Sequence, residues 1–159
     1  MSKRNGLYFG GAHIASIGLN SIEDDGLINN LLIGSGNVST DMDLGENLDS
    51  EAFQGRNFSS VSLSNAISVG DEAFKDCDAL TTVNLPSAVN IGHSAFRNCP
   101  ALTSVNIPMA TNVQNYTFDA CSSLTEINLP NATSVGDYAF MDCEALTSVN
   151  IPMVTNIGN

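Results

Sequence analysis

A step of 22 residues separates each of the four cysteines from the next, and this period constrains the fold more than any other feature of the sequence. Residues that occupy the same position in successive 22-residue units form what we call a column. Besides the cysteines, three more columns have one residue type throughout. The four columns are Cys77, Cys99, Cys121 and Cys143; Phe74, Phe96, Phe118 and Phe140; Leu80, Leu102, Leu124 and Leu146; Pro86, Pro108, Pro130 and Pro152. A fixed period of this length is typical of a solenoid, because one unit can bury its apolar side chains only against its neighbours.

Each unit contains two short extended pieces and one tight half-turn. Residues 82–86 alternate polar and apolar side chains, which predicts a strand, and Pro86 ends it because proline has no amide proton to donate. A second extended piece ends at the same position of every unit, at Val69, Ile91, Val113, Val135 and Ile157. The half-turn that follows, such as 70–77, is predicted to be a 3₁₀ or single α turn.

A looser copy of the unit begins at Phe58, and residues 48–53 resemble the tail of a still earlier copy. We therefore predict a solenoid of about five 22-residue repeats over residues 48–159. Residues 1–47 are predicted to be a small β-rich N-terminal segment that caps or anchors the solenoid. Within it, 7–11 and 14–18 are expected to be strands, and 28–34 either a strand or a brief helix.

The unit resembles the BspA-type leucine-rich repeat, which reads approximately L-x-x-I-x-I-P-x-x-V-x-x-I-G-x-x-A-F-x-x-C. Residues 80–86 and 91–99 match that pattern closely, whereas Gln114 replaces its glycine and Thr117 replaces its alanine. The resemblance implies an α/β leucine-rich-repeat solenoid, right-handed and dominated by parallel β-sheet, with short 3₁₀ or α turns. It also implies a non-enzymatic binding surface with no catalytic residues, of the kind carried by bacterial surface adhesins, protist surface proteins and some phage proteins.

The outward positions of the first strand of each unit form the candidate binding surface. They carry Ser, Thr and Asn, with one carboxylate. The candidates are Thr82, Asn84, Ser104, Asn106, Glu126, Asn128, Ser148 and Asn150. Stacked amides can simply hydrogen-bond to one another along the sheet, which is a structural role. The same flat polar face could instead bind protein or glycan, as repeat proteins commonly do.

The cysteines are predicted to form an inward-facing column of free thiols. Stacked parallel side chains do not give the dihedral angle of about 90° that a disulfide requires, and no spacing of Cys or His suits a metal. No motif for a nucleophile, a phosphate loop or a dinucleotide occurs. We therefore expect no catalytic residue, no metal, no cofactor and no enzymatic activity.

The acidic residues concentrate on the half-turns and leave the candidate binding surface nearly uncharged. The net charge is −12, from 17 Asp and Glu against 5 Lys and Arg. The half-turn acids are Asp71, Glu72, Asp76, Asp78, Asp119, Asp137, Asp142 and Glu144. Such a charge disfavours nucleic acid and anionic membranes. With no run of about 20 apolar residues and no convincing signal peptide, no membrane insertion is expected.

Two features of the units leave alternatives open. Tyr116 and Tyr138 occupy equivalent positions in adjacent units, where they could form an aromatic contact patch or stack on each other. In the final unit, Ile151, Val154 and Ile157 are predicted to leave an uncapped apolar edge, which suggests either a truncated chain or an edge that another subunit covers, as in a homo-oligomer.

Two functions follow as hypotheses. The first is a recognition or attachment module, extracellular or at a cell surface. The second is a virion component, for instance of a phage tail, that packs against neighbouring subunits.

Overall fold

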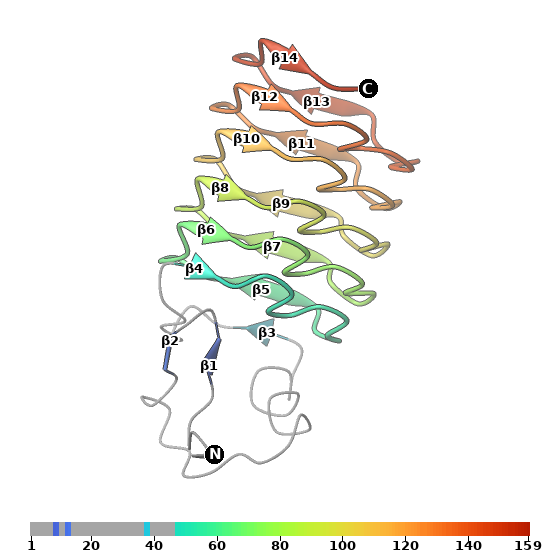
Figure 1. The fold of residues 1–159 in the computed structure, drawn as a ribbon. Helices are drawn as coiled ribbons and strands as arrows, with labels where there is room; N and C mark the ends of the chain where they lie inside the picture. The colour runs from blue at the N-terminus through green and yellow to red at the C-terminus, as the bar shows by residue number, and fades with distance from the viewer. Residues whose placement is uncertain (1–7, 10–11, 14–36, 39–46) are drawn as a thin grey trace.

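The computed structural model describes residues 8–9, 12–13, 37–38 and 47–159, and every structural statement below concerns these residues. Residues 47–159 coil into a solenoid whose successive turns lie directly above one another (Figure 1). The described part of the chain is built from strands and turns and contains no helix. It therefore contains no helix that could cross a membrane.

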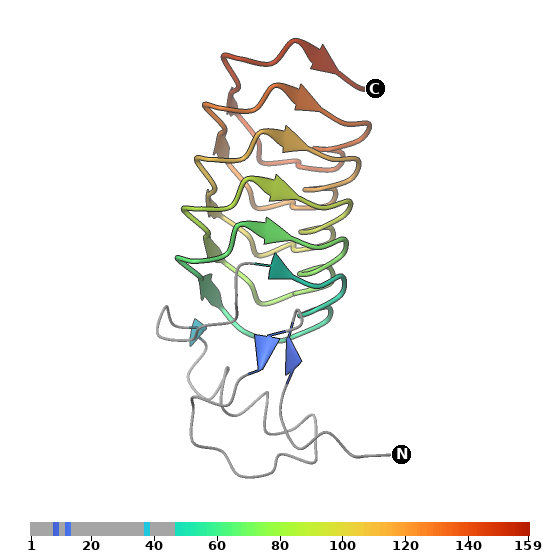
Figure 2. The ribbon, with the colours of Figure 1, turned by 60° about the vertical axis from the view of Figure 1, so that its left-hand side comes forward.

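Each repeat contributes one three-residue strand and one two-residue strand, as the extended pieces of the sequence predict. The three-residue strands are β5 (Ser60–Ser62), β7 (Thr82–Asn84), β9 (Ser104–Asn106), β11 (Glu126–Asn128) and β13 (Ser148–Asn150). The two-residue strands are β4 (Asn47–Leu48), β6 (Ser68–Val69), β8 (Asn90–Ile91), β10 (Asn112–Val113), β12 (Ser134–Val135) and β14 (Asn156–Ile157). Figure 2 shows the two sets forming separate walls of the coil.

All strand pairs of the solenoid are parallel and in register, so that each residue lies above its equivalent in the preceding repeat. Val61 pairs with Val83, and Val83 with Val105. The two-residue strands form one continuous six-stranded sheet from β4 to β14. This arrangement confirms the parallel solenoid with a 22-residue spacing.

Strand β3 (Asn37–Val38) extends the sheet of three-residue strands into the predicted N-terminal segment. It pairs in parallel with β5, with Val38 opposite Val61. The short strands β1 (Tyr8–Phe9) and β2 (Ala12–His13) pair antiparallel to each other. Strand β1 lies within the strand predicted at 7–11. The pieces predicted at 14–18 and 28–34 lie outside the described residues.

The half-turns form a third hydrogen-bonded ladder along the solenoid. The amides of Glu72, Phe74 and Asp76 donate to the carbonyls of His93, Ala95 and Arg97 in the next repeat, at N···O distances of 2.8, 2.8 and 2.9 Å. The same three positions repeat these bonds in the following turns.

The 3₁₀ or α geometry predicted for the half-turns is not confirmed. In a helix, every amide donates backwards to a carbonyl of its own turn. Here alternate amides donate to the next repeat, and two of these donors, Glu72 and Asp76, have a positive φ that reverses the chain. Glu72, with φ of 57°, is the third residue of a turn closed by the amide of Ala73 on the carbonyl of Gly70. A positive φ at this position belongs to type II turns.

Glycine at the start of the half-turn allows the repeats to approach closely. A Cβ on Gly92 would lie 2.6 Å from the amide nitrogen of Asp71 and from the carbonyl carbon of Gly70, both in the repeat below. Where Gln114 replaces this glycine, its amide makes no bond to the carbonyl of Ile91, whereas the amides of Gly92 and Gly136 donate to Val69 and Val113 at 2.9 and 2.8 Å. The glycine of the repeat unit is therefore explained by packing between turns.

The apolar columns predicted by the 22-residue period form one core. The phenylalanine rings stack face to face along the axis, with centroid distances of 5.2 Å from Phe53 to Phe74, 5.2 Å from Phe74 to Phe96 and 5.5 Å from Phe96 to Phe118. Val83, Leu102 and Leu124 are fully buried beside them. The inclusion of Phe53 in the column supports the earlier copy predicted at 48–53.

Candidate functional site

All eight candidate binding residues lie on the solvent-facing side of the three-residue strands, which we call the strand face. The pleat explains this placement, because successive side chains of a strand point to opposite sides. Val83 and Ile127, between the candidates, are 0% and 2% exposed. Seven of the eight candidates are exposed, and Asn84 is half-buried.

The asparagines of the strand face form part of the amide ladder that the structural interpretation predicts. The side-chain amide of Asn106 donates to Oδ1 of Asn84 at 2.7 Å, and that of Asn150 donates to Oδ1 of Asn128 at 2.8 Å. Asn84 in turn donates to Oγ of Ser62 at 2.9 Å.

The hydrogen-bonded ladder of the strand face is interrupted between β9 and β11. Strands β3, β5, β7 and β9 form one sheet, and β11 and β13 form a separate pair. The two-residue strands on the other wall pair without interruption across the same two repeats. In Figure 1, β11 and β13 lie above β9. The interruption is therefore confined to the strand face.

The backbone bonds that close the ladder elsewhere are missing at this gap. The amides of Leu85 and Leu129 donate to the carbonyls of Asn106 and Asn150, both at 2.9 Å. Among the described residues, the equivalent bond from Ile107 to Asn128 is not made. Nor does Thr125 donate to the carbonyl of Thr103, although Thr147 donates to the carbonyl of Thr125 at 2.9 Å.

A cavity of about 380 Å³ opens at the gap. The lining residues are Thr103, Ser104, Val105, Glu126, Ile127, Asn128, Ser148 and Asn150. The structure thus brings together the candidates of β9, β11 and β13, except Asn106, while Thr82 and Asn84 of β7 lie outside the lining. Sequence reasoning missed Thr103 and the gap itself. The one signal of this place in the sequence is Glu126, the single charged residue on the predicted strand face.

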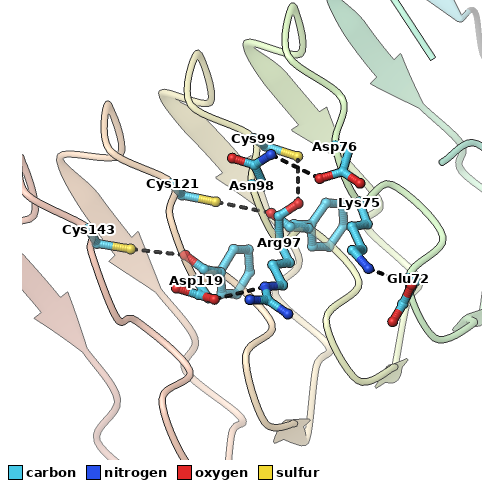
Figure 3. A network of polar contacts seen from close by, with 11 residues as sticks. Glu72, Lys75, Asp76, Arg97, Asn98, Cys99, Asp119, Cys121 and Cys143 are labelled. Atoms are coloured by element: carbon cyan, nitrogen blue, oxygen red, sulfur yellow. Dashed lines mark hydrogen bonds and ion pairs between the residues drawn. The ribbon is translucent and has the colours of Figure 1, made fainter. Parts of the chain in front are cut away.

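The cysteines form the predicted inward column of free thiols, and each thiol has a hydrogen-bond partner; Figure 3 shows Cys99, Cys121 and Cys143. The Sγ atoms of Cys99, Cys121 and Cys143 lie 3.1, 3.1 and 3.0 Å from phenylalanine carbonyl oxygens of the preceding repeats. Burial raises the pKa of the Cys77 and Cys121 thiols to about 12 and that of Cys143 to about 11. The thiols therefore remain protonated donors at neutral pH.

Asp119 does not belong to the solvated acidic stripe that the sequence predicts. It is 2% exposed, and its Oδ2 accepts from Nε of Arg97 at 2.9 Å (Figure 3). Asp119 follows Arg97 by one repeat, so the two side chains occupy the same column and meet. The ion pair offsets part of the lost hydration of this carboxylate, whereas its Oδ1 is buried without a hydrogen-bond partner.

The two tyrosines stack on each other, as one of the two alternatives predicts. The ring centroids of Tyr116 and Tyr138 are 5.1 Å apart, and the Arg97 guanidinium lies 5.4 Å from the centroid of the Tyr116 ring. Tyr138 remains 45% exposed, so a contact patch at this place stays a prediction. No group of three or more His, Cys, Asp or Glu side chains gathers as metal ligands within the described ranges.

The stacked repeats, their parallel strands and the polar strand face define a leucine-rich-repeat solenoid. The sequence model of the BspA type leucine rich repeat region matches residues 46–159 in six copies, and the chain belongs to this family. No curated protein matches the chain.

Solved structures with the same fold include a leucine rich cell surface protein from Faecalibacterium prausnitzii, 26% identical, with a TM-score of 0.63 over 72% of this chain and 39% of that one. A leucine-rich repeat protein from Bacteroides ovatus is 29% identical, with a TM-score of 0.68 over 74% of this chain and 32% of that one. The T. pallidum leucine-rich repeat protein, 23% identical with a TM-score of 0.64 over 71% of this chain and 56% of that one, shares the fold. The chain spans less than two thirds of the length of each of these proteins.

Proposed function

We propose that the chain is a non-enzymatic recognition or attachment module that binds protein or glycan through its strand face. The observation that carries this proposal is that uncharged polar side chains and exposed acidic side chains lie on different surfaces of the solenoid. Uncharged hydrogen-bonding side chains cover β7, β9 and β13, whereas the exposed acids Asp71, Asp142 and Glu144 lie on the half-turns. An uncharged polar surface loses less hydration energy than a charged one when it meets a partner, provided that the partner replaces its hydrogen bonds.

We propose a cell-surface or extracellular location for the module. The F. prausnitzii relative is a leucine rich cell surface protein, and it shares the solenoid at 26% identity. In this setting residues 1–47 would cap the solenoid or anchor it. The pairing of β3 with β5 supports the capping role, since β3 covers the strand edge that β5 would otherwise leave open.

The proposal is tested by changing the asparagine column of the strand face. Asn84, Asn106 and Asn128 are changed together to Ala, and binding to arrays of glycans and of host surface proteins is measured. Each amide contributes about 0.5–1.5 kcal/mol through hydrogen bonds, so the triple change is expected to weaken binding more than tenfold.

The other wall supplies a matched control for this test. Asn90, Asn112 and Asn156 are exposed asparagines on two-residue strands. Changing these three to Ala alters composition equally and should leave binding within about twofold. Unchanged binding after the strand-face substitutions would rule out the strand face as the binding surface.

A structural role in a virion, with the solenoid packed against neighbouring subunits, stays a prediction, as does a homo-oligomer through the last repeat. The apolar side chains Val149, Met153 and Ile157 support such packing, since they are 43%, 58% and 65% exposed.

A further inference from the structure

We propose that the gap between β9 and β11 is a saccharide-binding subsite that accepts one or two sugar rings. The inference rests on the proposed function of the strand face and assigns its ligand class and position. The starting observation is the interruption of a ladder that is otherwise continuous on this face from β3 to β9 and from β11 to β13.

At the gap, both donors and acceptors lack the hydrogen-bond partners that the same positions have in other repeats. On the donor side are the amides of Ile107 and Thr125 and the side-chain amide of Asn128. On the acceptor side are the carbonyls of Thr103 and Asn128 and Oδ1 of Asn106. Such groups require hydrogen bonds from solvent or from a ligand, because a backbone group left without either is costly.

Mixed donors and acceptors suit hydroxyl groups better than they suit a basic side chain. A hydroxyl donates one hydrogen bond and accepts others, whereas the guanidinium of arginine and the ammonium of lysine only donate. Of the donors at the gap, the side-chain amide of Asn128 belongs to a residue that lines the cavity, and a basic side chain would leave it unmatched. The Glu126 carboxylate, exposed in the cavity lining, can accept from two adjacent hydroxyls of one sugar ring.

The dimensions of the gap also favour a small ligand. An inserted peptide strand would require β9 and β11 to lie about 9.6 Å apart, which is twice the spacing of neighbouring strands. Their Cα atoms still approach within 8 Å. The cavity of about 380 Å³ falls within the range of small-molecule sites. Val105, half-buried in the lining, offers an apolar contact to the C–H face of a ring.

The experiment is a titration of the ¹⁵N-labelled full chain, followed by backbone amide chemical shifts. The probes are methyl α-mannopyranoside, methyl β-galactopyranoside and N-acetylglucosamine, with N-acetylarginine amide as the rival basic probe. At least one sugar is expected to shift the amides of Thr103, Val105 and Asn128 saturably. The Glu126→Gln variant should bind that sugar about tenfold more weakly, because it loses hydrogen bonds to a charged acceptor.

Glu144→Gln is the matched control, since it removes one exposed carboxylate from a half-turn. It should leave the sugar affinity unchanged. The inference is overturned if no sugar shifts the gap amides, if the shifts centre on Thr82 and Asn84 instead, or if only N-acetylarginine amide binds. Each of these results leaves the proposed function standing as long as the asparagine triple change still weakens binding to the array partner. Failure of both experiments would reject the strand face altogether.

Discussion

Each buried thiol combines two properties of cysteine at a single position of the repeat. It fills a small apolar site in the core, and it donates to a phenylalanine carbonyl, as Cys77 does to Phe53 with Sγ 3.2 Å from the oxygen. Alanine at this position would lose the donor. A thiolate could not donate, and burial opposes its formation. The column therefore depends on protonated thiols.

The cysteine column predicts a loss of stability at alkaline pH. Burial raises the pKa of Cys121 from an ordinary value of 9.0 to about 12 in the folded chain. Its contribution to stability is fully present below pH 9 and is lost as the pH rises toward 12, because only the unfolded chain ionises its thiol in that range. Urea unfolding midpoints measured from pH 7 to pH 11 should fall above pH 9.

Cys121→Ser provides the control for this pH dependence, since serine keeps a donor and does not titrate there. The variant should lose less of its stability between pH 9 and pH 11 than the natural chain does. All other ionisable groups are the same in both chains and cancel in the comparison. Identical slopes for the two chains would contradict the role assigned to the thiols.

The sequence predicts the burial of the cysteines but not that of Asp119. A position that is cysteine in every repeat predicts a buried column, because identical residues of successive repeats stack on one another. Asp119 occupies the column of Lys75, Arg97 and Met141, which has no common chemistry. Its burial depends on the particular neighbour Arg97 in the repeat below. Such contacts between unlike residues are invisible to a repeat consensus.

Among the elements, the strands follow from local sequence and the gap does not. Strands β9 and β13 have the same sequence, Ser-Val-Asn, yet β9 is unpaired toward β11 while β13 pairs with it. Side-chain alternation fixes which face a residue takes, since the pleat has a period of two. This alternation does not predict whether the strands of two particular neighbouring repeats form their backbone hydrogen bonds.

Hydrogen exchange tests the gap directly. The amides of Ile107 and Thr125 lack the carbonyl partners that Leu85 and Thr103 have. They should therefore exchange with deuterium at least about tenfold faster than those two equivalents, because no bond has to open first. The measurement is amide-resolved NMR exchange at neutral pH. Equal protection at all four amides would show that the ladder is closed in solution.

At the scale of the whole molecule, stability is distributed along one axis. Phe96 stacks on both Phe74 and Phe118, with centroid distances of 5.2 and 5.5 Å. Phe140 stacks on Phe118 at 5.7 Å and is partly exposed. In a linear array, each repeat is stabilised by its own interactions and by those with its nearest neighbours. A change in the middle of the array therefore weakens two interfaces.

Phenylalanine substitutions at the two positions should accordingly differ. Phe96→Ala is expected to cost about 3–5 kcal/mol of unfolding free energy, the range for a fully buried ring, and Phe140→Ala distinctly less. Urea unfolding followed by circular dichroism measures both, and the slope of each transition reports whether the array still unfolds as one unit. Equal losses at the two positions would contradict the linear account.

The half-turn ladder gives the solenoid an electrical direction. In the two sheets, amides point both ways along the axis, but in the half-turns the ladder amides of one repeat all donate to the next repeat. Aligned peptide groups add their dipoles, as they do in a helix. The turn of Tyr138, whose amide donates to Asn159, follows the same direction and carries the acids Asp137 and Asp142. Each half-turn thus presents partially positive amides to the repeat that follows it and partially negative carbonyls to the repeat that precedes it.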